Sequence, residues 1–575
     1  MKVSFFLFHP LSTVPLGRLW RVKIVNRDEE IRFVETDFVL GCDGGSSDVR
    51  HIMGIPFRGS SYTSQKWFVI DATIDEDLQQ NLDLGRTSVH PSSAFTAAPR
   101  RDGHAQVVPQ FQFICDPKRS GAQMALANGH YRWEFIALPD PHRAEKLETD
   151  EYLSRPEVLM KLLKTRGILH NRRIYMVVKK VKKIGITEEV FKTHIHPNII
   201  RTVIYTFQSR SAEKWGLRCE STSSSTGNAK NTTSSRGGGV FLLGDAAHLL
   251  PPFTGQGMCA GIRDAFNISW KIHYVVNNKA SPSILDSYEI ERRSHVDRVR
   301  RMSVLLGSLI MTRNPTFARM RDWLAYTLQS SKAIVSFING NDIFRPLTYF
   351  WDGLLGSDFV EDSRHWLTRT LRSWQTALLL RFSPVGDIFI QPKVHVLTPE
   401  RNHHHCKDRV MQELPLDEVL ARDGRFSMVV RVRDGDNATH PEELLGPDSL
   451  RFWKGLGLKV VMVVDSPKQV RTQPERAEDT NGIESVWVQD IQGHVRTYCS
   501  SHNCEIALVR PDRIVFAVLA MDARQLNNLS TEVAQSLTSP SCHAVWRSAS
   551  KKRNGQLWQL FLHVFLLTLL LFILF

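Results

Sequence analysis

The sequence predicts an α/β (α+β) chain of several structural units, because three patterns follow one another along its 575 residues. A buried strand that ends in a glycine turn occurs twice, at residues 37–45 and 240–245. Between them, "YRWEFIAL" at residues 131–138 alternates polar and apolar side chains, which is typical of an antiparallel sheet. After about residue 408, strand-like and helix-like runs alternate and predict a separate α/β domain.

The elements before the second glycine turn follow from local patterns. Apolar residues alternate from Trp20 to Ile24 and again from Ile31 to Phe33, and "NRDEE" between them predicts the turn that joins two strands. Other expected elements are a strand at 66–74, a polar loop at 82–106, and helices at 150–165 and 186–193.

Residues 218–239 consist almost entirely of Ser, Thr, Asn and Gly. Such a segment cannot offset its ordering entropy, so it predicts a disordered insert within the fold. After Gly257, apolar residues recur at helical spacing from Ile262 to Ile272. Helical segments are expected from there to about residue 380.

The charge and the cysteines exclude several classes of protein. The net charge is +14 and the pI about 9.4, but Lys and Arg are spread along the chain, so no nucleic-acid partner is expected. Eight irregularly spaced cysteines make no disulfide framework and favour a reducing compartment. The groups His403–Cys406 and Cys499–Cys504 lack the paired ligand spacing of zinc sites, and no metal is expected.

The C-terminus differs in composition from the rest of the chain. Residues 557–575 contain no charged side chain, and as a helix they would extend about 28 Å, close to a ~30 Å hydrocarbon core. Lys551, Lys552 and Arg553 precede them. The segment therefore predicts a transmembrane tail anchor with the bulk of the chain facing the cytoplasm. The alternative that this end is a spurious extension of the gene stays open.

The stretch "VFLLGDAAHLLPPFTGQG", from Val240 to Gly257, has the features of a ligand site. Asp245 follows a buried strand, and ligands bind at the carboxyl ends of strands in open α/β sheets. Gly255 and Gly257 let backbone N–H groups approach a flat ligand, and the following helix points its positive end there. The carboxylate can accept hydrogen bonds from the hydroxyls of a polyol, and the N–H groups can face a ring that becomes anionic when it is reduced. This combination indicates FAD. The simpler alternative is a plain turn and helix start.

This stretch resembles the second flavin motif of the FAD-dependent aromatic hydroxylases, the single-component flavoprotein monooxygenases. "VLGCDGGSSDVR" at 39–50 resembles their other internal motif, which lies near the FAD pyrophosphate and helps NADPH or NADH to engage. "RDAFNISWKI", "LDSYEIERR", "SPVGDIFIQPKV" and "ALVRPDRIVFAV" are similar to segments of the 3-(3-hydroxyphenyl)propionate hydroxylase group, so the resemblance covers about residues 20–540. It implies these cofactor-binding residues: Asp43, Gly44, Ser47, Arg50, Gly244, Asp245, Ala246, Ala247, His248, Pro251, Gly255, Gln256, Gly257, Met258 and Cys259.

The resemblance also implies a domain organisation. The expected parts are a partial FAD-binding domain of Rossmann-like fold at 1–65 and 205–300, a substrate-binding sheet domain at 66–204, a helical segment at 301–400, a thioredoxin-like domain at 408–545, and the transmembrane tail at 557–575. The family begins with a βαβ unit that carries Gly-x-Gly-x-x-Gly, and no such pattern occurs in this sequence. We therefore expect a member that is truncated at its N-terminus. Cys259 is a second departure, because relatives usually carry Asn there.

The function implied is hydroxylation of a small aromatic compound with O2 through a flavin C4a-hydroperoxide, after NAD(P)H has reduced FAD. Arg132 is a candidate for binding a substrate carboxylate, although a solvated strand face explains it as well, and Tyr131 is a second candidate on the substrate side. No catalytic residue is assigned, although Tyr131 and His248 are considered. A homodimer is compatible with the sequence. The alternative function is a truncated, non-catalytic relative that acts as a membrane-anchored remnant or interaction protein.

Overall fold

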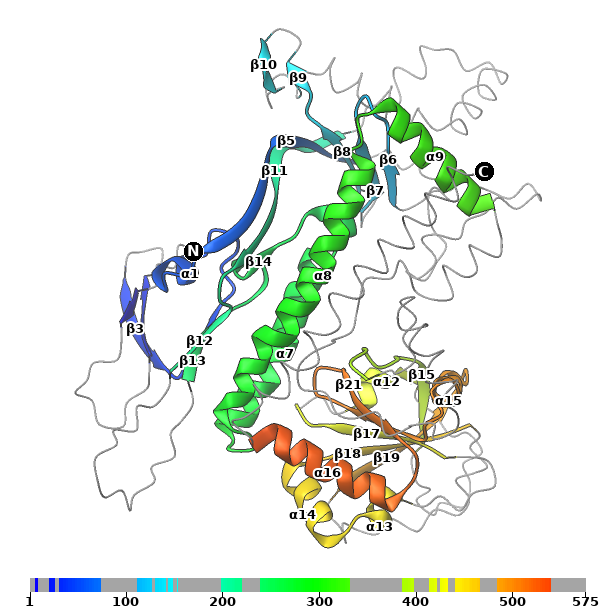
Figure 1. Cartoon of the computed structure of the whole chain (residues 1–575). Coiled ribbons are helices and arrows are strands. Elements are labelled where there is room, and N and C mark those ends of the chain that lie inside the picture. The colour runs from blue at the N-terminus through cyan, green and yellow to red at the C-terminus, as the bar shows by residue number, and fades with distance from the viewer. Residues whose placement is uncertain are drawn as a thin grey trace, which may run out of the picture.

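The structure is a computed structural model. It describes residues 6–8, 20–25, 30–73, 111–126, 130–140, 143–147, 153, 198–219, 238–330, 385–397, 413–420, 424–432, 440–465 and 483–538. Figure 1 shows the described residues as coloured strands and helices.

The first sheet is antiparallel and confirms the strands expected near the N-terminus. Its order is β1-β2-β3, with β1 at Phe6–Phe8, β2 at Trp20–Val25 and β3 at Ile31–Thr36. Trp20 pairs with Thr36 and Val25 with Ile31, so the predicted turn joins β2 and β3. Trp20 and Val22 point to the core, as the alternation requires.

The two glycine-turn strands lie side by side although about 200 residues separate them. β4 (Phe38–Gly41) pairs in parallel with β13 (Gly238–Leu242), and β12 (Gly216–Cys219) borders β13 on its other edge. Because β4 and β13 are parallel, both turns emerge at the same edge of the sheet. The short helix α1 (Asp48–Ile52) follows the first turn.

This sheet corrects the expected boundaries of the disordered insert. Arg218 and Cys219 end β12, and Gly238 and Gly239 begin β13, so the first two and last two residues of the 218–239 segment are strand. They are ordered because they pair with each other across the ladder, a long-range contact that composition does not reveal. Residues 220–237 lie outside the described residues.

The expected strands at 66–74 and 131–138 fall in a six-stranded antiparallel sheet. Its order is β14-β11-β5-β8-β7-β6, formed by β5 (Phe57–Thr73), β6 (Phe111–Ile114), β7 (Gly121–Ala125), β8 (His130–Ile136), β11 (Asn198–Ala212) and β14 (His248–Leu249). A separate pair contains β9 (Pro139–Asp140) and β10 (Arg143–Leu147). β5 crosses the expected boundary at residue 65 without a break, and Figure 1 shows β5 and β11 running together from α1 to β8.

Long helices follow the second glycine turn, as expected. α7 spans Gly257–Val276, η5 spans Pro282–Leu285, α8 spans Asp286–Ile310 and α9 spans Pro315–Ser330. Short 3₁₀ turns η3 (Gly244–Ala246) and η4 (Pro252–Thr254) precede α7. α8 continues through the expected domain boundary at residue 300, because its buried residues recur at helical spacing on both sides of that point.

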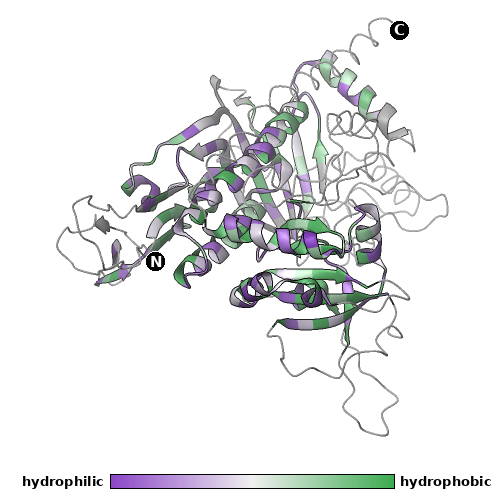
Figure 2. Cartoon of the chain, turned by 60° about the horizontal axis from the view of Figure 1, so that its bottom comes forward, coloured by the Kyte–Doolittle hydropathy of each residue, from purple (hydrophilic) through white to green (hydrophobic). Residues whose placement is uncertain are grey.

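The C-terminal part is a seven-stranded mixed sheet with helices. The order β16-β15-β19-β18-β17-β20-β21 is made by β15 (Lys393–Leu397), β16 (Glu413–Pro415), β17 (Ser427–Arg431), β18 (Lys459–Val464), β19 (Glu484–Asp490), β20 (Ile506–Val509) and β21 (Val515–Leu519). Its helices are α12 (Leu416–Val419), α13 (Pro441–Leu444), α14 (Pro447–Leu456), α15 (His494–Ser501) and α16 (Ala523–Thr538). Figure 2 shows mostly apolar central strands between helices of mixed hydropathy.

The strand β15 corrects one expected boundary. It lies at residues 393–397, inside the segment assigned to helices, and it pairs with β19 of the C-terminal sheet. The short pattern "KVHVL" alternates as a strand, but its partner is about 90 residues away. The strand order β18-β17-β20-β21 is compatible with the thioredoxin-like fold, which stays a prediction.

One apolar core joins the cofactor-side helices to the C-terminal sheet. Trp270 and Tyr274 of α7 pack edge-on against Phe426, with ring centroids 5.9 and 6.2 Å apart. Beside them, a fully buried ion cluster connects Lys271 and Glu291 to Arg510. Glu291 Oε2 accepts hydrogen bonds from Lys271 Nζ at 2.8 Å and Arg510 Nη2 at 2.9 Å.

The ion cluster sets the charge state of its members. Burial alone would raise the pKa of Glu291, but the charges of Arg510 and Lys271 lower it to about 2. Burial lowers the pKa of Lys271 to about 8, against the opposing effect of Glu291. Asp512 balances the second cation, with Oδ2 2.6 Å from Arg510 Nη2. The C-terminal domain is therefore attached by paired charges as well as by apolar contact.

Several sequence predictions concern residues outside the described ranges. They are the loop at 82–106, the helix at 186–193, the helical segments expected between 331 and about 380, and the tail at 557–575; of the helix at 150–165, Leu153 alone is described. Within the described ranges no helix is both long and apolar enough to cross a bilayer, and no cluster of His, Cys, Asp or Glu could hold a metal ion.

We expect Glu291→Gln to lower the free energy of unfolding by about 3–5 kcal/mol, because buried Lys271 would lose its counter-charge and Arg510 would keep Asp512 as its one carboxylate in the cluster. The effect should fade in acid. The carboxyl is stabilising above its ordinary pKa of 4.5, and this contribution disappears as the pH falls toward the folded value of about 2. Denaturant unfolding at pH 7 and at pH 3 measures both effects.

Asp297→Asn is the matched control on the same helix, because Asp297 forms a partly exposed i,i+3 pair with Arg300. Its cost should stay below about 1 kcal/mol. Equal losses for the two variants would contradict the role given to the buried cluster.

Candidate functional site

The turn after β13 presents one exposed carboxylate. All five residues of β13 are buried, and the chain then turns through Gly244, whose φ of 57° lies in the left-handed region. This conformation suits glycine, which has no Cβ to clash. Asp245 follows and is exposed, with no hydrogen-bond or ion-pair partner among the described residues. Its oxygens are therefore free to accept hydrogen bonds from a ligand.

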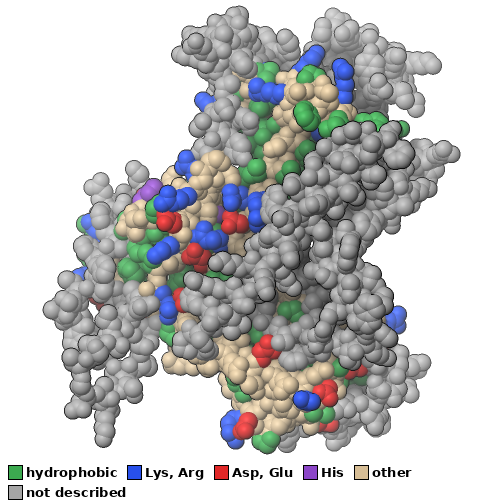
Figure 3. Space-filling model, in the orientation of Figure 1, with side chains coloured by type: hydrophobic (Ala, Val, Ile, Leu, Met, Phe, Trp, Pro, Cys, Tyr) green, Lys and Arg blue, Asp and Glu red, His purple; other side chains and the backbone are tan. Residues whose placement is uncertain are grey.

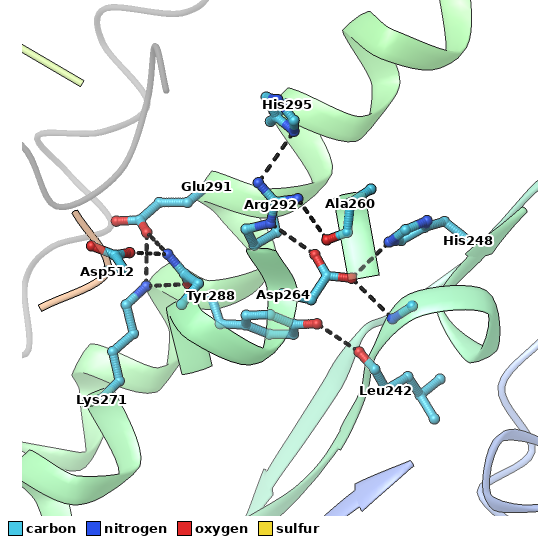
Figure 4. Close-up of polar contacts among 12 residues, drawn as sticks. Leu242, His248, Ala260, Asp264, Lys271, Tyr288, Glu291, Arg292, His295 and Asp512 are labelled. Atoms are coloured by element: carbon cyan, nitrogen blue, oxygen red, sulfur yellow. Dashed lines mark hydrogen bonds and ion pairs between the residues drawn. The ribbon is translucent and has the colours of Figure 1, made fainter. Parts of the chain in front are cut away.

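Asp264 of α7 holds this turn in place. The residue is fully buried, and its Oδ2 accepts a hydrogen bond from the Gly244 N–H at 2.9 Å. The same oxygen lies 2.7 Å from His248 Nε2, and Oδ1 accepts from Arg292 Nε at 2.7 Å (Figure 4). Burial alone would raise the pKa of Asp264, but Arg292 and His248 outweigh it and the pKa is lowered. One carboxylate thus connects the turn, β14 and α8.

Two further contacts hold α8 against the start of α7 and against the end of β13. Arg292 Nη2 donates to the carbonyl oxygen of Ala260 at 3.1 Å, and Tyr288 Oη donates to the carbonyl of Leu242 at 2.7 Å (Figure 4). Gly261 lies so close to Gly244 that a Cβ on Gly261 would stand 3.1 Å from the Gly244 Cα. The helix therefore approaches the turn as closely as two glycines allow.

The first turn of α7 leaves its backbone N–H groups available. Its N-cap, Gln256, makes no side-chain capping bond. Gly255 has a φ of 63°, and a Cβ on Gly255 or Gly257 would meet nothing within 4 Å. The first N–H groups of a helix have no partner inside the helix, and a 20-residue helix adds the positive end of its dipole. This end can hold the electron-rich edge of a ring or another anion.

Several buried polar atoms around the turn accept or donate no hydrogen bond within the described residues. They are His248 Nδ1, Thr254 Oγ1, Gln256 Oε1, Arg263 Nη1 and Arg50 Nε. An unsatisfied buried polar group costs about 1–3 kcal/mol, and a polar ligand bound at this loop would supply partners for these five. A flavin cofactor with many hydrogen-bonding groups fits this arrangement.

The first glycine motif meets the second through Arg50. Its Nη1 donates to the carbonyl of Ala246 at 3.0 Å and its Nη2 to that of Gly45 at 2.9 Å. The guanidinium lies 4.1 Å from the centroid of the Phe57 ring, and the residue is buried. The structure therefore places Arg50 between the two motifs, and its Nη groups bind the protein's own backbone.

The other predicted residues of this motif shape the turn. Gly44 has a φ of 81°, Ser47 Oγ caps α1 by accepting from the Arg50 N–H at 3.0 Å, and Asp43 Oδ2 accepts from the Val49 N–H at 3.0 Å. The remaining predicted residues, Ala246, Ala247, Pro251, Met258 and Cys259, lie in the second turn and the first turn of α7. The fold thus brings the predicted cofactor residues together at one sheet edge.

The predicted substrate residues lie elsewhere, on the six-stranded sheet. Arg132 donates to both oxygens of Asp71, from Nε at 2.7 Å and from Nη2 at 3.0 Å. Arg201, which the sequence did not suggest, also donates to Asp71 Oδ2. Burial would raise the pKa of Asp71, but the two arginines lower it. Tyr131 pairs with Ala72 in the ladder, and its side chain lies outside the described part.

Asp264 and Arg292 are the site residues that sequence reasoning missed. Asp264 lies four residues after Ala260, on the buried face of α7, where an apolar residue is the norm. Arg292 lies in "EIERR", also on a buried helix face. The two charges fall at apolar-face positions of their helices, and this would have been the one signal for a pair, because buried charges require partners.

We expect Asp264→Asn to lower the stability of the cofactor-free protein by about 3–5 kcal/mol, because Arg292 would lose its buried counter-charge. Asp245→Asn, nineteen residues earlier, should change it by less than about 0.5 kcal/mol, because that carboxylate is exposed and unpaired. Thermal unfolding without added ligand compares the two. A stable Asp264→Asn protein would show that the network does not hold the turn.

Comparison with known families supports the cofactor site. The model of the FAD binding domain matches residues 21–128 and 211–303, which include both glycine motifs. The model of the HcaD C-terminal domain matches residues 386–536, which include β15 and the rest of the C-terminal sheet. The second match places the start of that domain earlier than the expected residue 408.

Curated relatives have one name in common. The chain is 27% identical over 491 residues to the 3-(3-hydroxy-phenyl)propionate/3-hydroxycinnamic acid hydroxylase of Klebsiella pneumoniae, a match that covers 85% of this chain and 66% of the relative. It is 28% identical over 498 residues to the enzyme of that name from Mycolicibacterium smegmatis, covering 86% and 66%. The chain therefore spans slightly less than two thirds of the length of these relatives.

Solved structures show the same fold. The flavin-dependent monooxygenase PieE, in complex with FAD and substrate, has a TM-score of 0.52 at 17% identity, covering 93% of this chain and 75% of that one. Aklavinone-11 hydroxylase, with FAD and aklavinone, has a TM-score of 0.50 at 16% identity, covering 93% and 74%. The chain thus matches the models of an FAD binding domain and an HcaD C-terminal domain, and it is similar in sequence to hydroxylases of one name and in fold to flavin-dependent monooxygenases.

Proposed function

We propose that this chain binds FAD between the turn after β13 and the first turn of α7, and that it hydroxylates an aromatic compound with electrons from NADPH or NADH. The observation that carries the proposal is the free carboxylate of Asp245 beside a helix N-terminus that lacks a side-chain cap. The family match and the hydroxylase names of the relatives support an enzyme over a non-catalytic remnant.

Specific residues would hold the cofactor. Asp245 would accept hydrogen bonds from the ribityl hydroxyls, and the N–H groups of Gly257 and Met258 would face the ring edge that gains charge on reduction. Asp43, Gly44 and Ser47 would lie toward the pyrophosphate, with Arg50 joining the two motifs. Cys259 stands in the same first helical turn as a weak donor.

FAD would supply the activation of O2 and the transfer of one oxygen atom to the aromatic ring. The protein's own residues bind, orient and exclude water. Asp264 keeps the turn rigid, so Asp245 and the N–H groups of α7 need no rearrangement when the ligand arrives. The aromatic rings of Trp67, Phe207 and Phe253 pack between the sheet and the cofactor loop and keep this side apolar.

The substrate side of the proposal uses the six-stranded sheet. Arg132 and Arg201 share one carboxylate, Asp71, so the three side chains carry a net charge of +1. Such a row suits the anionic group of an aromatic acid, and Arg201, with 56% of its side chain exposed, is the more accessible of the two arginines. The predicted membrane tail at 557–575 lies outside the described residues.

Figure 3 shows one face of the molecule, on which the Lys and Arg side chains of the described residues are scattered. On the visible described surface, Lys and Arg side chains stand among Asp and Glu side chains and form no continuous basic stripe. Binding along a phosphate backbone would require such a stripe.

We expect Asp245→Ala to weaken FAD binding about ten- to hundredfold, because one charge-assisted hydrogen bond contributes about 1.5–3 kcal/mol. Quenching of FAD fluorescence during titration measures the affinity. Asp448→Ala, an exposed carboxylate on α14, serves as the matched control. Activity is measured as oxidation of NAD(P)H that depends on 3-(3-hydroxyphenyl)propionate. Equal FAD affinity in the parent and in Asp245→Ala would show that the motif has been misread.

A further inference from the structure

A buried carboxyl group lies on the sheet face that leads to the cofactor loop, and the cofactor site does not use it. Glu134 of β8 is 8% exposed, and its Oε2 accepts a hydrogen bond from Tyr205 Oη of β11 at 3.0 Å. Its other oxygen, Oε1, accepts no hydrogen bond from any described residue. A carboxyl group is costly to bury with a single neutral partner, so a function is the simplest reason for its presence.

The strand register places Glu134 between a charged row and an aromatic cluster. Asp71 pairs with Arg132 on one side and with Arg201 on the other, and Val69 pairs with Glu134 in the next row of the same face. In the row after that, Trp67 pairs with Ile136 and Tyr205. Rows on one face of a strand repeat every two residues, about 7 Å apart, so Glu134 lies about 7 Å along the sheet from the two arginines.

The aromatic cluster connects the carboxyl group to the cofactor loop. The ring of Tyr205 lies 5.0 Å from that of Phe207, and Phe207 lies 5.2 Å from Phe253, which belongs to the loop before α7. An aromatic ring bound against this cluster would place a substituent next to Glu134. The spacing thus offers one hydrogen-bond acceptor beside a ring and a cationic row farther along the sheet.

We propose that Glu134 determines specificity for a hydroxylated aromatic ring, by accepting a hydrogen bond from the substrate's phenolic hydroxyl through Oε1 while Tyr205 positions the carboxyl group. This inference rests on the proposed hydroxylase function and adds to it the residue that selects phenols over unhydroxylated rings. An anionic acceptor also draws the hydroxyl proton away from the ring oxygen, which makes the ring more electron-rich and more reactive toward oxygen transfer.

The electrostatic surroundings support this role. Burial raises the pKa of Glu134, and Asp71 raises it further, whereas Tyr205 and Arg132 lower it. Arg201 also lies near this group, because it pairs with Asp71 in the neighbouring row of the sheet. Because the deprotonated form is the strong acceptor, preference for a phenol should be complete above the pKa of Glu134 and should decline as the pH falls through it.

The test compares two ligands that differ in one hydroxyl. With the full chain and saturating FAD, calorimetry measures the affinities of 3-(3-hydroxyphenyl)propionate and 3-phenylpropionate from pH 5 to pH 9. The parent should prefer the phenol about ten- to hundredfold at high pH, as expected for one charge-assisted hydrogen bond. Glu134→Gln should reduce the preference to threefold or less and remove its pH dependence, with little change for 3-phenylpropionate.

Tyr205→Phe tests the positioning role separately and still applies if Glu134→Gln fails to fold. Removing the hydroxyl that lowers the pKa of Glu134 should move the midpoint of the pH dependence to higher pH. Glu213→Gln is the matched control, because Glu213 forms an exposed pair with Arg58 at the other end of β5 and β11, and it should leave the preference unchanged.

The outcomes separate this inference from the proposed function. A parent that shows no preference for the phenol, or a Glu134→Gln variant that keeps it, overturns the inference even if the chain hydroxylates its substrate. A preference that depends on Glu134 in a chain that neither binds FAD nor oxidises NAD(P)H supports the inference and contradicts the proposed function instead.

Discussion

The buried carboxylate of Asp264 is the interaction on which the arrangement of the proposed cofactor site depends. It accepts from a backbone N–H of the turn after β13 and from Arg292 of α8, and it contacts His248 of β14. Each of these groups belongs to a different element, so a single side chain sets the turn, the helix start and the sheet edge relative to one another. A buried charge of this kind is stable only when all its partners are present, and the three elements are therefore interdependent.

The same principle recurs at the junction with the C-terminal domain. Lys271, Glu291 and Arg510 are fully buried and paired, and the apolar contacts of Trp270 and Tyr274 surround them. α7 takes part in both networks, with Asp264 near its start and Lys271 two turns later. The sequence of α7 therefore has to match both the turn after β13 and the C-terminal domain. This explains why a helix with an apolar face also carries buried Asp, Asn and Lys.

Local patterns in the sequence predicted much of the fold and part of the site. The strands near Trp20 and Ile31, the strand "YRWEFIAL" and the helix after Gly257 were confirmed, because each has an unambiguous period of its own. The two glycine turns were confirmed as turns at one sheet edge, and their role in holding the cofactor stays a prediction. What the sequence missed depends on distant partners: β15 was misassigned because β19 is about 90 residues away, and the ends of the insert proved to be paired strand.

The site residues divide in a similar way. Asp245 could be recognised because a carboxylate follows a buried strand, whereas Asp264 looks locally like an ordinary polar residue of a helix. Arg132 was identified as a cation on a strand, but its partner Asp71 and its neighbour Arg201 became visible only through the register of three strands. The position of Glu134 beside Tyr205 likewise depends on a diagonal contact between strands about 70 residues apart.

The buried cluster at the domain junction also limits how this protein can be recombined. Arg510 and Asp512 come from the C-terminal sheet, while Lys271, Glu291 and Asn267 come from α7 and α8. A chimera that received the C-terminal domain of a relative would have to receive a matching set of charges on both helices. Exchange of that domain alone would leave charged side chains buried without partners in an apolar interior. The C-terminal domain should therefore be exchanged together with α7 and α8.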